Sequence, residues 1–212
     1  MTESALKHSF FQREDESDDS IFYTEPRLLV HIDDYAIEAA RRLYAELLPR
    51  HAALLDLMSS YKSHMPPDLQ WTRLAGIGMN ETELRENDQL TDYAVANINA
   101  DPRLPYGDEE FDGAVVTVSV QYMTRPVEVF RDVARVLKPD APFIITYSNR
   151  MFPTKAVRIW RALDDRERAA LISVYFREAG GFGDVTMEDR SIDSGGYNDP
   201  LFAVWARRSS AT

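Results

Sequence analysis

The segment LPYGDEEFDGAVVTVSVQYMTRPVEVFRDVARVLKPDAPFIITYSN, residues 104–149, decides the fold of this 212-residue chain. Its apolar, β-branched run at residues 111–120 is typical of a strand that is covered on both faces. In residues 124–139 the apolar side chains recur at helical spacing, and a Lys-Pro pair closes the run. PFIITYS, residues 142–148, then predicts another strand. A strand, a helix and a strand in this order indicate an α/β unit with parallel strands.

The rest of the chain continues this alternation. Asp33 and Asp34 are suitable N-caps for a helix, and Asn80 with Glu83 three positions later predicts the start of another. Further strands are expected at residues 52–57, 72–77, 93–98, 184–192 and 201–208, and further helices at residues 154–163 and 165–178. We therefore predict a single domain over residues 21–212, in which a parallel sheet ends in an antiparallel pair.

The first 20 residues form a separate segment by composition. They are polar, and five carboxylates lie between Glu14 and Asp19. We expect this acidic segment to be flexible, with a lid that folds over a ligand as the alternative. It lacks the basic start and the apolar run of a secretory signal.

The composition excludes several kinds of function. A net charge of −11 and a pI near 4.8 oppose binding to nucleic acid and to anionic membranes, because both are polyanions. No window is apolar enough to span a membrane. The chain has no cysteine and four scattered histidines, so we expect neither a disulfide nor a metal site. These features predict a cytoplasmic protein with a small-molecule substrate.

Residues 104–149 closely resemble the small-molecule branch of the class I S-adenosylmethionine-dependent methyltransferases. A Leu-Pro pair, an acidic turn, Phe111-Asp112, the buried strand and the helix that ends in RVLKP agree with the family in order and spacing. Extended in both directions, the resemblance covers about residues 54–207. It implies a Rossmann-like fold with a seven-stranded, mostly parallel sheet, a C-terminal antiparallel hairpin, helices on both faces, and S-adenosyl-L-methionine as cofactor.

Two cofactor loops depart from the family pattern. The first loop of the family reads Asp-Leu-Gly-x-Gly-x-Gly, whereas Met58, Ser60 and Lys62 stand here at the glycine positions. The acidic residue that follows the second strand and binds the ribose hydroxyls in the family falls here at Gly78 or Met79. The resemblance nevertheless implies cofactor contacts for residues of the four strand-to-helix loops, namely Asp56, Ser59, Ser60, His64, Met79, Asn80, Asn97, Ile98 and Gln121.

The chemistry of these residues suits parts of the cofactor. Serine hydroxyls can donate to its carboxylate, and Lys62 or a protonated His64 can pair with it. The other interpretation is that the first loop only fills a vacated site. Asn80 can bond a ribose hydroxyl through its side-chain oxygen. By the resemblance, Asn97 faces the adenine amino group and Ile98 packs on the ring.

Two functions stay open on the sequence. The first is a methyltransferase for a small molecule, with His64, His31 and Tyr122 as candidates for a base if the acceptor must lose a proton. The second is a non-catalytic binding or scaffold protein whose cofactor pocket has degenerated. We expect residues 21–35 and 148–163 to form the acceptor side. The sequence identifies neither the acceptor nor the oligomeric state.

Overall fold

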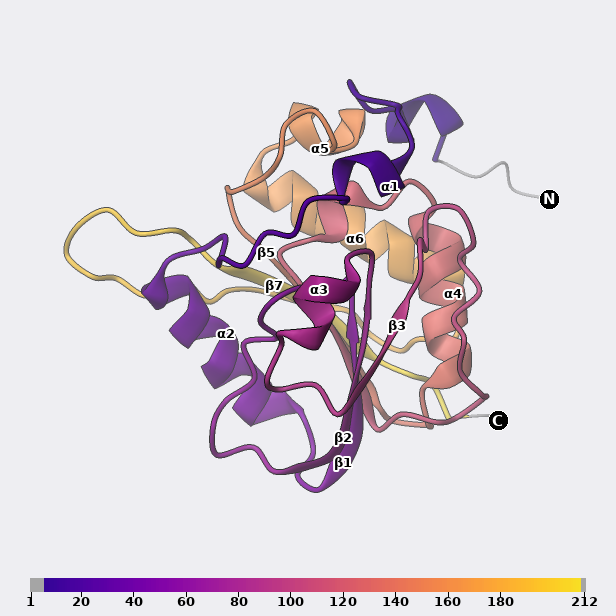
Figure 1. The fold of residues 1–212 in the computed structure, drawn as a ribbon, viewed down its shortest axis with the longest axis vertical. Coiled ribbons are helices and arrows are strands. Elements are labelled where there is room, and N and C mark those ends of the chain that lie inside the picture. The colour runs from indigo at the N-terminus through magenta and orange to yellow at the C-terminus, as the bar shows by residue number, and fades with distance from the viewer. Residues whose placement is uncertain (1–5, 211–212) are drawn as a thin grey trace.

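The structure, a computed structural model, describes residues 6–210 and contains one seven-stranded sheet (Figure 1). The strand order is β3-β2-β1-β4-β5-β7-β6. Strands β1 to β5 run parallel, whereas β7 is antiparallel to both β5 and β6. The strands are β1 (Ala52–Leu57), β2 (Trp71–Gly78), β3 (Asp92–Val95), β4 (Gly113–Thr117), β5 (Pro142–Tyr147), β6 (Thr186–Asp189) and β7 (Phe202–Arg207). This confirms the predicted fold class, including the antiparallel C-terminal pair.

Capping side chains start two of the helices where the sequence predicted them. Asp33 caps α2 (Asp34–Leu47) by accepting a hydrogen bond from the Ala36 N–H, and Asn80 caps α3 (Glu81–Arg85) by accepting one from the Glu83 N–H. The remaining helices are η1 (His8–Phe11), α1 (Asp19–Phe22), η2 (Val120–Tyr122), α4 (Pro126–Val136), α5 (Arg158–Ala162) and α6 (Asp165–Ala179). Among residues 6–210, no helix combines the length and the apolar composition that a bilayer crossing demands.

Some elements are shorter than the sequence predicted. The strand expected at 111–120 ends at Thr117, because Val118 adopts a left-handed backbone conformation with φ of 45° and Val120 opens a short helix. The strand expected at 93–98 ends at Val95. Asn97 turns the chain there, because its side-chain oxygen accepts hydrogen bonds from two following backbone N–H groups. Both turns lie at the carboxyl ends of the parallel strands.

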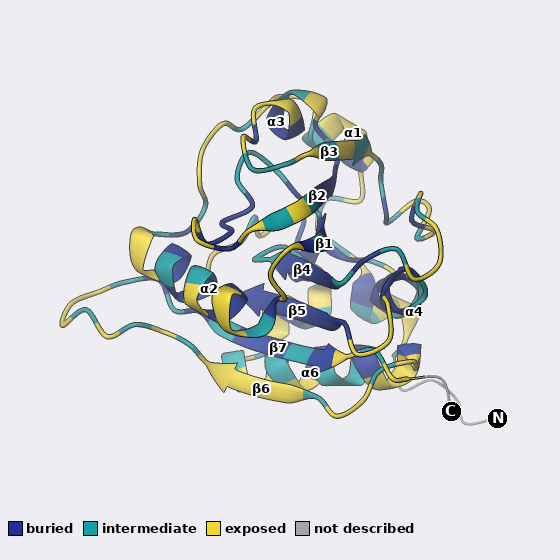
Figure 2. Cartoon of the chain, turned by 90° about the horizontal axis from the view of Figure 1, so that it is seen from below, coloured by how far each residue is buried: buried dark blue, intermediate teal, exposed yellow. Residues whose placement is uncertain are grey.

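Helices cover both faces of the sheet. On one face α2 packs over the central strands through Leu43 and Tyr44, which are fully buried. On the other face α4 and α6 enclose a core with an aromatic centre, in which the rings of Phe130, Phe143 and Phe176 meet edge to face. Figure 2 shows the result, with β4 and β5 buried between the helical layers and β6 exposed at the edge.

Part of the acidic N-terminal segment packs against the domain. Residues 6–20, which belong to the segment that the sequence predicted to be flexible, lie beside α5 (Figure 1), whereas residues 1–5 lie outside the described part. The Lys155 side chain is completely buried and donates hydrogen bonds to the backbone oxygens of Asp15 and Ser17. Its ammonium group also lies 3.4 Å from a carboxylate oxygen of the buried Asp19. A single lysine therefore contacts three residues of the segment, Asp15, Ser17 and Asp19.

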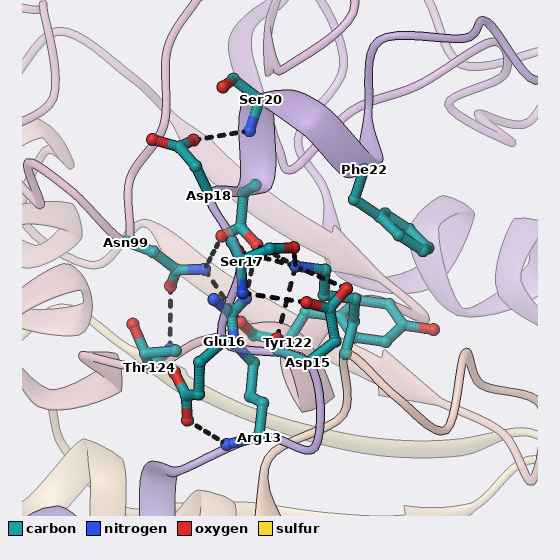
Figure 3. Close-up of polar contacts among 12 residues, drawn as sticks. Arg13, Asp15, Glu16, Ser17, Asp18, Ser20, Phe22, Asn99, Tyr122 and Thr124 are labelled. Carbon is teal, nitrogen blue, oxygen red and sulfur yellow. Dashed lines mark hydrogen bonds and ion pairs between the residues drawn. The ribbon is translucent and has the colours of Figure 1, made fainter.

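The same carboxylate has two further partners. Arg13 donates to one oxygen of Asp19, and the side-chain amide of Asn99 donates to the other at 3.0 Å. Asn99 in turn donates to the Tyr122 backbone oxygen and accepts from the Thr124 N–H (Figure 3). Because buried charges are costly unless they are paired, this network explains why so polar a segment can be packed.

Replacing Lys155 by methionine tests this network. We expect Lys155→Met to lower the free energy of unfolding by about 2–3 kcal/mol, because Asp19 then keeps only part of its compensation. Limited proteolysis of the folded variant is expected to cut within residues 13–20. Lys138→Met is the control, since that lysine is 45% exposed and its bond to Asp112 is worth about 1 kcal/mol or less. If the two substitutions lowered the free energy of unfolding equally, the buried network around Lys155 would not be what holds the segment.

Candidate functional site

A pocket of about 610 Å³ opens at the carboxyl ends of the parallel strands. The loops that follow β1, β2, β3 and β4 form one wall, and residues 13–31 and 149–153 form the other. Ligands of open α/β sheets bind at this edge, because the loops there leave the sheet in different directions. The volume lies within the range of roughly 300–1,000 Å³ that is usual for small-molecule sites.

The first loop makes its turn without glycine. Met58 adopts a left-handed conformation with φ of 59°, which a residue with a side chain takes up at a cost of about 1 kcal/mol. The chain then folds back over β2, where the Ser59 N–H donates to the Ile77 backbone oxygen at 2.6 Å. A Cβ atom at Gly78 would collide with the Ser59 backbone oxygen. The close backbone approach of this loop therefore depends on a glycine at the end of β2.

The second loop binds the segment that covers the pocket. The side-chain amide of Asn80 donates to the backbone oxygens of Tyr23 and Thr24, at 2.9 and 3.2 Å. Its side-chain oxygen accepts from the Glu83 N–H at 3.1 Å. Glu83 is 6% exposed and lines the pocket, where its carboxylate accepts from the Ser60 hydroxyl and from the Arg27 backbone N–H. The second loop therefore joins residues 23–27 to the first loop.

The third and fourth loops leave groups that face the pocket. Asn97 and Ile98 line it, and Ile98 is 4% exposed. Val118 also lines it, and its φ of 45° is rare for a β-branched residue. The next residue, Ser119, has an enclosed hydroxyl oxygen with no hydrogen-bond partner in the structure of residues 6–210. A strained backbone next to an unpartnered polar group is typical of a ligand site.

The pocket has an aromatic wall, formed by residues 23–31 and 149–153 together with Tyr122 of the fourth loop. Tyr122 and Phe152 stack at 5.9 Å, and the Tyr122 hydroxyl accepts a hydrogen bond from the Phe152 N–H. His31 meets Phe152 edge to face at 5.3 Å, and Tyr23 lines the same wall. Burial lowers the pKa of His31, which keeps its imidazole neutral near pH 7, and raises the pKa of Tyr122, which keeps its hydroxyl protonated. Of these two base candidates, His31 has the protonation state that can accept a proton.

Three of the residues expected at the cofactor do not line the large pocket. Asp56 and His64 lie on an adjoining cavity of about 50 Å³ that shares lining residues such as Ser59 with the large pocket, and Gln121 is buried, with its amide donating to the Val118 backbone oxygen. Burial raises the pKa of Asp56 to about 6 and lowers the pKa of His64 to about 4. His64 is therefore neutral near pH 7, unlike the expected cation, while Lys62 pairs with Asp88 at 2.7 Å.

The structure brings the other expected residues together at the pocket. These are Ser59, Ser60, Met79, Asn80, Asn97, Ile98, His31 and Tyr122. Sequence reasoning did not single out Glu83, Arg27 or Ser119 as lining residues, although Arg27 falls within the expected acceptor segment 21–35. Glu83 carried a signal, because a helix-capping partner three residues after Asn80 points back toward the strand end. No local sequence signal indicated the position of the Arg27 side chain, because that position depends on how residues 22–31 fold over the sheet. No group of three or more potential metal ligands occurs within residues 6–210.

Alanine at Gly78 tests the crossing of the first loop over β2. We expect Gly78→Ala to lower the free energy of unfolding by about 3 kcal/mol, because the collision is with backbone and the loop must move. Gly76→Ala is the matched control in the same strand, where the new Cβ would lie 2.6 Å from a methyl group of Leu90 that can rotate away. A cost of about 1 kcal/mol or less is expected there. A Gly78→Ala protein as stable as the control would show that the loop does not need this approach.

The two buried groups of the small cavity give opposite pH dependences. A folded-state pKa of about 4 for His64 means that the unfolded chain binds the extra proton between about pH 6.5 and 4, so its contribution to stability is lost as the pH falls. The raised pKa of Asp56 means that the folded chain binds the extra proton between about pH 4 and 6, so its contribution is lost as the pH rises. Each contribution amounts to about 3 kcal/mol.

Single substitutions separate the two contributions in denaturant unfolding at pH 4 to 7. Relative to wild type, we expect His64→Asn to become more stable as the pH falls and Asp56→Asn to become less stable. Asparagine suits position 64 because it tolerates the left-handed backbone found there, with φ of 56°. Parallel pH profiles for the two variants would refute the burial of both groups.

A scan against family models matches residues 69–145 to the methyltransferase domain. No curated protein matches the chain. Many solved structures do, among them a Haloferax volcanii putative methyltransferase in complex with the Trm112 activator, with a TM-score of 0.63, 14% identity, and coverage of 84% of this chain and 92% of that one. The matched region includes β2 to β5 and therefore the second, third and fourth loops of the pocket.

Two further structures show the range of this fold. A Thermotoga maritima S-adenosylmethionine-dependent methyltransferase, described as a possible histamine N-methyltransferase, has a TM-score of 0.59 at 16% identity, covering 82% of this chain and 90% of that one. The [4+2]-cyclase SpnF has a TM-score of 0.56 at 16% identity, covering 81% of each chain. Residues 69–145 thus match the methyltransferase domain, and the seven-stranded sheet has the fold of solved S-adenosylmethionine-dependent methyltransferases.

Proposed function

We propose that this chain binds S-adenosylmethionine along the carboxyl ends of β1 to β4 and directs its methyl group to a small molecule held against the aromatic wall. The observation that carries the proposal is the pocket itself, which joins all four strand loops to a second wall built from residues 13–31 and 149–153. The second wall includes parts of both segments that the sequence assigned to the acceptor side. Because these segments cover the strand ends, the space between the walls favours a small acceptor.

The residues present fit the cofactor. The enclosed Ser119 hydroxyl lacks a protein partner within the described chain, so a polar ligand atom would complete its hydrogen bonding. The Glu83 carboxylate lines the pocket from the first turn of α3 and can accept hydroxyl hydrogen bonds, in place of the acidic residue that the end of β2 lacks. Ile98 offers an apolar surface for a ring. Ser59 and Ser60 line the same wall, and Asn97 turns the third loop beneath it.

The bound cofactor supplies an electrophilic methyl group on a sulfonium centre. The contribution of the chain is to hold an acceptor in line with that group and to exclude water, since positioning alone can provide much of the acceleration of such a displacement. His31 is suited to take a proton from an acceptor hydroxyl or amine, because it faces the pocket as a neutral imidazole. Its edge-to-face contact with Phe152 fixes the ring.

A non-catalytic binding protein is the competing function. The glycine-free first loop favours it, and the SpnF neighbour shows that this fold also serves reactions described under other names. Against it, the loops after β1 to β4 keep an open pocket of about 610 Å³ instead of filling it with side chains. A degenerate site has no physical reason to retain a strained Val118 and an enclosed, unpartnered Ser119 hydroxyl.

Calorimetry with S-adenosylmethionine and S-adenosylhomocysteine tests the proposal. We expect dissociation constants in the micromolar range, about −8 kcal/mol, for the wild type. Ser60→Phe is expected to abolish binding, because the half-buried Ser60 lines the pocket and a phenyl ring would displace the ligand. Ser209→Phe is the control, since Ser209 is exposed beyond the end of β7 that pairs with the start of β5, away from the carboxyl ends of the parallel strands. No heat with either ligand at millimolar concentration would exclude the cofactor site and favour the non-catalytic function.

A further inference from the structure

The charged groups of the pocket differ in how completely they are paired. Of its carboxylates, Asp19 accepts from Arg13 and Asn99, and Glu83 accepts from Ser60 and the Arg27 backbone. The pocket arginines other than Arg27 also have carboxylate partners. Arg13 pairs with Asp19, Arg161 with Glu14 at 2.9 Å, and Arg150 with Asp199 at 3.9 Å.

Arg27 is the exception among the pocket arginines of the described chain, residues 6–210. No carboxylate lies within ion-pair distance of its guanidinium group there. One guanidinium nitrogen, Nη2, donates to the Phe22 backbone oxygen at 3.0 Å, while the other, Nη1, is enclosed and has no hydrogen-bond partner in the described chain. An enclosed cationic donor without an acceptor is costly, so a ligand that supplies an anionic oxygen would be favoured.

Aromatic rings surround this guanidinium group. Its central carbon lies 4.4 Å from the ring centroid of Phe22, 5.4 Å from that of Phe152 and 5.7 Å from that of Tyr23. Phe152 in turn stacks on Tyr122 of the fourth loop, which also lines the pocket. The contacts hold the guanidinium in one place and provide flat apolar surfaces beside it. A cation fixed among aromatic rings is complementary to a flat molecule that carries an anion.

We propose that the acceptor of this enzyme is a small aromatic carboxylate, whose carboxylate group binds the Nη1 side of Arg27 while its ring packs on Phe152 and Tyr122. The inference rests on the proposed function for the place of the cofactor. It adds the chemical class of the acceptor and a residue that determines specificity.

The cofactor also contains a carboxylate, so the source of the anion must be distinguished. Arg27 belongs to the covering segment, on the aromatic wall with Phe152, whereas the proposed cofactor groups belong to the strand loops of the facing wall. The Arg27 backbone N–H bonds the Glu83 carboxylate, which fixes the arginine above the second loop and leaves its side chain on the aromatic side. This placement favours the acceptor over the cofactor as the partner of Nη1.

The experiment measures binding of benzoate, phenylacetate and indole-3-acetate, each beside its primary amide, to the full chain saturated with S-adenosylhomocysteine. Calorimetry or ligand-observed NMR gives the affinities. At least one acid is expected to bind with a submillimolar dissociation constant, and its amide at least tenfold more weakly, since the amide lacks the charge that Arg27 pairs with. Arg27→Met is expected to remove the difference between acid and amide while S-adenosylhomocysteine affinity stays within twofold of wild type.

Two further variants control for charge and folding. Arg42→Met removes an exposed arginine of α2 and is expected to leave both affinities unchanged. Arg27→Lys keeps the charge but not the planar fork, and an intermediate preference for the acid is expected. Retained binding of S-adenosylhomocysteine by Arg27→Met reports that its pocket is folded. Should that variant fail to fold, the result with Arg27→Lys decides, and an unchanged acid preference there would count against the proposal.

Three outcomes would overturn the inference. Acids and amides could bind equally well to the wild type, or none of the acids could bind at about 5 mM, an affinity too weak to be specific. Arg27→Met could also weaken S-adenosylhomocysteine at least tenfold without affecting 5′-methylthioadenosine, which lacks the carboxylate, and Arg27 would then belong to the cofactor. If S-adenosylhomocysteine itself fails to bind, the proposed function fails, and the acid and amide titrations on the protein alone still decide the role of Arg27.

Discussion

The crossing of the first loop over the end of β2 is the constraint on which the site depends. The Ser59 backbone oxygen occupies the space where a side chain at position 78 would lie, and the Ser59 N–H bonds the Ile77 backbone oxygen. Loops that hold a nucleotide-like ligand need close approach of backbone to backbone, and glycine normally provides it within the loop. In this chain the glycine is on the neighbouring strand instead. The glycine-free first loop therefore lies against a glycine, Gly78, at the end of β2, where the resemblance puts the acidic residue at position 78 or 79.

This arrangement has consequences for the rest of the pocket. With no side chain at the end of β2, acceptors for hydroxyl groups must come from farther along, and Glu83 reaches the pocket from the first turn of α3. The same carboxylate accepts hydrogen bonds from Ser60 of the first loop and from the backbone N–H of Arg27, in the segment that covers the pocket. Asn80 adds two bonds to that cover, and Lys155 fixes the segment that precedes it. The pocket is thus closed by polar contacts that originate next to the altered loop.

The sequence predicted the sheet better than the pocket, for physical reasons. Buried strands such as β4 and β5 follow from uninterrupted apolar runs, and helix starts follow from capping side chains such as Asp33, because these signals are local. The position of the Arg27 guanidinium depends on Asn80 and Glu83, more than 50 residues away, and no local pattern encodes it. The sequence did not predict how the acidic residues 14–19 pack, because their compensating cation, Lys155, lies about 140 residues later. Long-range pairing of charge is the part that single-sequence reasoning lacks.

The distribution of charge within the fold bears on the kind of ligand that the chain accepts. A net charge of −11 would by itself attract cations, yet the carboxylates that face the pocket are already bonded to donors of the protein. Among the pocket residues of the described chain, the buried groups without a hydrogen-bond partner are Nη1 of Arg27, Nε of Arg13 and the hydroxyl of Ser119, and the two guanidinium nitrogens can only donate. At short range in an enclosed site, such donors outweigh the screened field of distant surface charges. The proposed selectivity of the pocket for an anionic ligand therefore follows from which groups are satisfied, and it runs opposite to the sign of the whole protein.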